Sequence, residues 1–128
     1  MITFGFRGHA MSVDPFTDRL ARVRHRFAST LEGKIDDAYA AVVHLAEGEP
    51  GAAPAVAESY RSLHGIVGIG PTVGFPNTGR AAHEAEDVLR LAQQAKRGLN
   101  PAEIQSLKRR LHVLREAAEL ELRGFYST

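Results

Sequence analysis

Histidine is the side chain of this 128-residue sequence best suited to nucleophilic chemistry at neutral pH, because cysteine is absent. Among the six histidines, His64 stands in a cluster of three glycines, Gly65, Gly68 and Gly70. A glycine inside a helix costs roughly 1 kcal/mol relative to alanine. Locally unfavourable residues gathered around one nucleophile indicate a function, and here they would let a partner's active site approach the imidazole closely.

The helix that contains His64 has a regular apolar stripe, formed by Val56, Tyr60, Leu63 and Val67. Projection at about 100° per residue places His64 about 80° from the centre of this stripe, at the edge of the helix. Arg61 lies one turn before His64 and Gly68 one turn after it, both on the exposed side. We therefore expect an accessible imidazole with one neighbouring cation and little steric cover.

Two amphipathic segments are predicted in the first half of the chain. The first begins after Asp14-Pro15 and has apolar residues at steps of three and four as far as Leu45. Gly33 interrupts it, which predicts one bent helix or two consecutive helices. After a Gly- and Pro-rich loop at 47–54, the His64 helix starts near Pro54 and ends by Pro71.

Two further helices are predicted in the second half. Residues 77–96 have mostly alanine on their inner face, which allows close helix packing, and Gly98 is expected to be the C-terminal cap. The last helix starts with Asn100 as the N-cap and Glu103 completing a capping box, and Gly124 should end it.

These segments predict one all-α domain, an antiparallel four-helix bundle with an additional or bent N-terminal helix, over residues 14–124. Residues 1–13 are expected to be a disordered or start-site extension and residues 125–128 a C-terminal tail. The first apolar stripe needs a partner to pack against.

At this point the sequence resembles the histidine phosphotransfer (HPt) domains. Their signature contains the phosphorylated histidine, an apolar residue, two glycines and an acidic residue on the next helix. The matching residues are His64, Ile66, Gly68, Gly74 and Glu86. The chain departs from the signature at Val67, where HPt domains usually have a lysine.

The resemblance implies a phosphoryl carrier of a two-component phosphorelay that has no kinase activity of its own. By this resemblance His64 would be the phosphoacceptor, and Gly68 and Glu86 would support the motif. Arg61 and Gly65 are further candidates for the docking surface because they lie beside His64 on its helix. The implied partners are response-regulator receiver domains, and a hybrid histidine kinase as a further candidate. The chain needs no cofactor, because the receiver would supply the Mg²⁺.

Composition and spacing argue against other classes of function. The net charge of +1 gives no basic excess for binding nucleic acid. Apolar runs are too short to cross a membrane and no export signal is evident, so we expect a cytoplasmic protein. Histidine spacings typical of metal-binding bundles are absent, and the glycines at 68–74 follow a helix rather than the strand of a dinucleotide-binding loop.

Two alternatives to phosphotransfer remain at this stage. Val67 favours a module that uses the same surface to sequester a receiver or a kinase without being phosphorylated. The other alternative is a structural bundle that oligomerises through its first stripe. Taken singly, Arg61 and Glu86 could also be solvated charges on a helix face. His25, His44, His83 and His112 have no accompanying motif, and we assign them no function.

Overall fold

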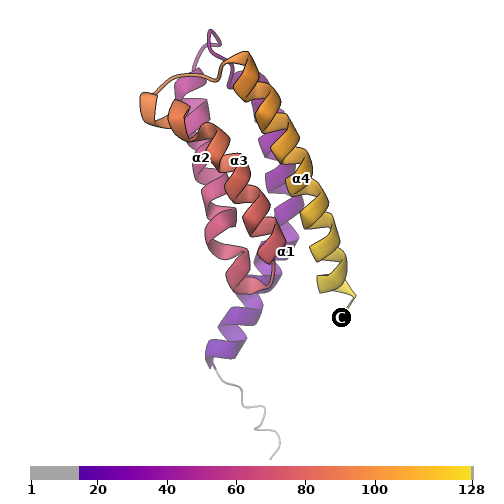
Figure 1. Ribbon diagram of the computed structural model, residues 1–128. Coiled ribbons are helices and arrows are strands. Elements are labelled where there is room, and N and C mark those ends of the chain that lie inside the picture. Colours follow the sequence, from indigo (N-terminus) through magenta and orange to yellow (C-terminus); the bar gives the residue numbers. More distant parts are fainter. Residues whose placement is uncertain (1–14, 128) are drawn as a thin grey trace, which may run out of the picture.

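A computed structural model describes residues 15–127 and confirms the all-α four-helix bundle. The helices are α1 (Pro15–Ala41), α2 (Ala52–Ile69), α3 (Pro76–Ala95) and α4 (Pro101–Tyr126), and short 3₁₀ helices follow α1 (Val42–His44) and α2 (Pro71–Val73). The four long helices run alternately up and down, and α4 returns beside α1 (Figure 1). The predicted extension at 1–13 lies outside the described residues.

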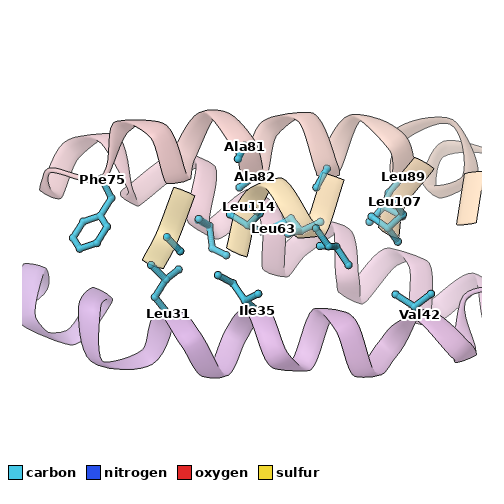
Figure 2. Close-up of a cluster of buried hydrophobic side chains, with 14 of the residues drawn as sticks. Leu31, Ile35, Val42, Leu63, Phe75, Ala81, Ala82, Leu89, Leu107 and Leu114 are labelled. Atoms are coloured by element: carbon cyan, nitrogen blue, oxygen red, sulfur yellow. The ribbon is translucent and has the colours of Figure 1, made fainter. Parts of the chain in front are cut away.

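Every helix contributes side chains to one continuous apolar core. Figure 2 shows Leu31 and Ile35 of α1 lying between that helix and the others, close to Leu63 of α2 and Leu114 of α4. The inner face of α3 is mainly alanine, as the sequence predicted: Ala81, Ala82, Ala85 and Ala92 are all buried. Such small side chains allow α2 and α4 to pack closely against α3.

The first apolar stripe forms one uninterrupted helix through Gly33, so the prediction of two consecutive helices is wrong. The N-terminal part of this stripe is only partly covered, because Val23 is 45% exposed and Leu20 is half-buried. The reason is geometrical: the first turns of α1 extend beyond the connection between α2 and α3 (Figure 1). The apolar residues of these turns therefore border open surface.

Several helix ends differ from the sequence prediction. Helix α2 begins at Ala52, and Pro54 lies within its first turn, where a missing N–H group is harmless. Lys96, at φ 55°, takes the left-handed conformation that ends α3, a role we expected of Gly98. Gly98 instead lies against the backbone of Glu47, where a Cβ atom would come within 2.7 Å.

Both ends of α4 are fixed by specific contacts. Asn100 and Glu103 form the predicted capping box, with N–H···O distances of 2.8 and 2.9 Å. At the other end the helix continues through Gly124, where we expected it to stop. Phe125 lies in its last turn, and the ring contacts His25 of α1 and Phe75 before α3, so tertiary packing holds the final residues in the helix.

Candidate functional site

The antiparallel packing of α2 and α3 places His64 opposite Glu86. The two helices come close where Pro71 lies over Gly79, because a Cβ atom on Gly79 would be only 2.7 Å from the proline ring. About three helical turns from this contact, towards the start of α2 and the end of α3, Tyr60 of α2 interacts with Arg90 of α3. Between these two contacts the register brings the imidazole and the carboxylate face to face.

The imidazole of His64 is exposed but held in one orientation. Its side chain is 66% exposed, at the helix edge where the sequence projection placed it. Nδ1 lies 2.7 Å from Oε1 of Glu86, and the Tyr60 ring stacks nearly parallel to the imidazole with ring centroids 6.0 Å apart. An ionised carboxylate only accepts hydrogen bonds, so opposite an ionised Glu86 the proton of a neutral imidazole is on Nδ1 and the lone pair is on Nε2. Within residues 15–127, Nε2 has no hydrogen-bond partner.

Glu86 is a buried carboxylate, and the interpretation of it as a solvated surface charge is wrong. Only 3% of its surface is exposed, which makes it one of two buried polar or charged residues in the described part of the chain. Its second oxygen, Oε2, lies 3.3 Å from Nδ1 of His83. One carboxylate thus accepts from two histidines, His64 on α2 and His83 on its own helix.

The sequence analysis assigned no function to His83, yet the structure brings it into the site. Its side chain is 52% exposed, and it reaches Glu86 from one turn earlier on α3. The signal was present in the sequence as a His-x-x-Glu spacing, because residues three apart share a helix face. Metal-binding bundles use the reverse order, Glu-x-x-His, so their typical spacing does not include this pair.

The glycines near His64 fall into two kinds. At Gly65 and Gly68 a Cβ atom would meet nothing within 4 Å, so the surface beside the imidazole is open at both positions. Gly70 is different, because a Cβ atom there would lie 2.9 Å from the carbonyl oxygen of Ile66. Gly70 therefore serves the tight turn after α2, and the idea that all three glycines provide access is wrong for this one.

The charged and apolar neighbours predicted on α2 lie as follows. Arg61 is exposed, and its guanidinium makes no hydrogen bond or ion pair with any residue in the range 15–127. Val67 is half-buried and packs against the core. Glu84, considered together with Glu86 in the sequence, points the other way and binds Arg110 of α4 at 2.8 Å.

An apolar groove begins one helical turn from His64. Gly68 and Ile69 of α2 form one side of it, and the uncovered first turns of α1 form the other, with Phe16, Leu20 and Val23. The groove is open because α1 extends past α2, and Ile69 is 43% exposed within it. Arg24 of α1 donates from Nε to the carbonyl oxygen of Val73 at 3.0 Å, which fixes the 3₁₀ helix at the end of the groove.

Three further findings concern possible metal sites, membrane spans and similar proteins. Residues 15–127 contain no group of three or more side chains arranged to hold a metal ion. None of the helices in this range combines the length and apolar character that crossing a bilayer requires. Comparison with protein-family models, curated proteins and solved structures finds no match for this chain.

Proposed function

We propose that this chain is a histidine phosphotransfer protein that accepts a phosphoryl group on Nε2 of His64 and passes it on to a receiver-domain aspartate. The observation that supports this most directly is the pairing of an exposed imidazole with a buried carboxylate at 2.7 Å. Glu86 fixes the tautomer, so the nucleophilic lone pair is on the nitrogen that faces away from the bundle. A histidine with only a structural role would not need an open surface at Gly65 and Gly68.

The transfer step follows from this arrangement. The Nε2 lone pair attacks the phosphorus of an aspartyl phosphate, the bond from phosphorus to the aspartate oxygen breaks, and the aspartate leaves as a carboxylate. The imidazole becomes positively charged, and Glu86 stabilises this charge through the Nδ1–H hydrogen bond. The reverse sequence returns the phosphoryl group to another aspartate. By resemblance to the HPt family, the Mg²⁺ for this reaction belongs to the receiver.

The groove at Gly68 is the surface on which the receiver would dock. A receiver's aspartate must come within bonding distance of His64, and the groove lies one turn away on the same helix. Its exposed apolar side chains, Val23 and Ile69, suit a partner with an apolar contact surface. Arg19 on the rim supplies a positive charge near a partner whose active site is acidic.

Phosphoryl acceptance tests the central residue. The wild type and a His64→Gln variant would be incubated with radiolabelled phosphorylated receivers, and the label would be tested for the acid lability and base stability of phosphohistidine. We expect labelling in the wild type and none in His64→Gln, with little change in melting temperature because the side chain is mostly exposed. His112→Gln is the matched control, because His112 is an equally exposed histidine paired with Glu116. Label retained in His64→Gln, on His83 or elsewhere, would refute the assignment.

A charge placed in the groove tests the docking surface. Ile69→Glu should weaken receiver binding about tenfold, as expected for an apolar contact worth ~1–2 kcal/mol. Val43→Glu is the control, because Val43 is also an exposed β-branched apolar residue, 67% exposed, but follows the C-terminal end of α1, away from the groove. Equal binding by both variants, measured by titration calorimetry, would show that the receiver does not use this groove.

Val67 favours a second candidate, a module that binds a receiver without accepting phosphate. Its apolar side chain is packed against the core and offers no charge to a phosphoryl group. The same experiments separate the two functions. Receiver binding that His64→Gln leaves unchanged, together with no label on the wild type, would identify the binding module.

A further inference from the structure

His83 and His64 share the Glu86 carboxylate in a way that the sequence resemblance does not account for. Oε1 lies 2.7 Å from Nδ1 of His64, and Oε2 lies 3.3 Å from Nδ1 of His83. The two histidines come from different helices, α2 and α3. Among the described residues these are the two hydrogen-bond partners of the Glu86 side chain.

A buried carboxylate needs partners for both of its oxygens. Glu86 is 3% exposed, so water has little access to an oxygen that loses its donor, and an unsatisfied buried acceptor is unfavourable. The last torsion of a glutamate side chain is soft, with broad minima rather than three narrow ones. A carboxylate held at one oxygen can therefore turn about this bond, whereas one held at both oxygens cannot.

Helix register places His83 beside the turn that follows His64. Pro71 faces Gly79 and His64 faces Glu86. The residues from His64 to Pro71 therefore face the residues from Gly79 to Glu86 on α3. Val67 and His83 lie in these two segments. Val67 supplies no polar group, so the polar contact on this side of the site comes from α3.

We propose that His83 is a positioning residue for His64. It holds Oε2 of Glu86 so that Oε1 stays aligned with Nδ1 of His64, and it thereby keeps the His64 lone pair on Nε2. His83 does not itself form a bond to phosphorus. The proposal deepens the function proposed above and rests on it for its effect on transfer, but its effect on the His64 ring stands independently.

Two substitutions of His83 distinguish the effect of its hydrogen bond from the effect of its side-chain volume. His83→Leu removes the donor and keeps a side chain of comparable size, whereas His83→Gln retains an N–H donor that can reach Oε2. The His64 ring would be observed by ¹⁵N–¹H NMR, which distinguishes the two tautomers and needs no partner. Transfer from a phosphorylated receiver would be followed in single turnovers over a range of receiver concentrations. His112→Leu is the control for loss of an exposed histidine that contacts a glutamate at 3.3 Å.

For His83→Leu we expect a mixed tautomer population at His64 and a saturating transfer rate lowered about two- to tenfold, because the hydrogen bond from His83 acts on the imidazole only through Glu86. The receiver concentration at half-saturation should not change, because His83 acts on the reacting ring and not on docking. His83→Gln should restore the single tautomer and a rate within about twofold of wild type.

Two outcomes would overturn the proposal: a His83→Leu variant with wild-type tautomer and rate, or a His83→Gln variant as impaired as His83→Leu. If the wild type accepts no phosphoryl group from any receiver, the proposed function fails. The NMR comparison then still decides whether His83 orients His64.

Discussion

Replacing Gly68 by glutamine should stabilise the protein and impair phosphoryl transfer at the same time. Gly68 lies inside α2, and a Cβ atom there would meet nothing within 4 Å, so the larger residue fits without strain. Glycine is less favourable than a straight-chain residue in a helix interior by about 0.5–1 kcal/mol. For a domain of this size the gain corresponds to a rise in Tm of about 2–5 °C.

The cost to transfer follows from the same open space. A glutamine at position 68 lies one turn from His64 and borders the apolar groove, so a docking receiver must restrict or displace it. Immobilising one flexible side chain costs about 0.5–1.5 kcal/mol, which lowers receiver affinity about two- to tenfold. The imidazole itself is untouched, so the rate at saturating receiver should change less than the affinity.

Urea unfolding and receiver titrations on Gly68→Gln and Gly33→Gln would measure both effects. Gly33 is the matched control, because it is a helix-interior glycine of α1 that is also open within 4 Å and lies outside the groove. Both variants should be more stable than wild type, and only Gly68→Gln should bind the receiver more weakly. A stabilised Gly68→Gln protein with wild-type affinity would refute the argument that this glycine provides access.

Three other substitutions test the packing and the charges. Gly79→Ala should destabilise the protein by about 1–2 kcal/mol in urea unfolding in spite of better helix propensity, because its Cβ atom would overlap the ring of Pro71 at 2.7 Å. The pKa of Glu103 is lowered chiefly by the hydrogen bond from Arg97 and further by the backbone of Asn100. The ionised Glu103 side chain therefore stabilises the fold above the unfolded-state pKa, and this stabilisation disappears as pH falls through the folded-state pKa. Glu103→Gln should therefore cost about 1 kcal/mol at pH 7, and thermal unfolding in acid should show the difference from wild type vanishing. Arg61→Ala should slow transfer by about fivefold at most, and more at low salt than at high salt, because salt screens an exposed charge. Equal rates for variant and wild type in stopped-flow experiments at both ionic strengths would show that Arg61 does not act on the phosphoryl group.

Local features of the sequence predicted the four long helices and the N-terminal cap of α4. The period of three and four residues identified every long helix, because an apolar stripe must be buried whatever its partner is. Asn100 and Glu103 identified their capping box because both hydrogen bonds close within four residues. His64 could be placed at the edge of its helix for the same reason, since its angle to the stripe is a property of one helix alone.

Contacts between helices were beyond these local rules. Periodicity gives the face that a helix buries but not its register against a neighbouring helix. From the sequence alone, Glu86 and His83 could therefore equally have been a pair of solvated side chains on the surface of α3. The N-terminus of α3 shows the same limit: the backbone N–H groups of Asn77 and Thr78 are capped by Glu121 of α4, more than forty residues away, at 3.0 and 2.8 Å.

The sequence by itself determined which residues form helices, which stripe each helix buries, and that His64 lies next to open glycines. Tertiary structure alone decided that α1 extends past α2 to leave the groove at Gly68, and that the last turn of α4 persists because Phe125 packs against α1. It also decided that one buried carboxylate joins His64 to His83. The physical reason is that local propensities and caps act over a few residues, whereas register and relative helix length are set by side chains that meet only after the bundle has closed.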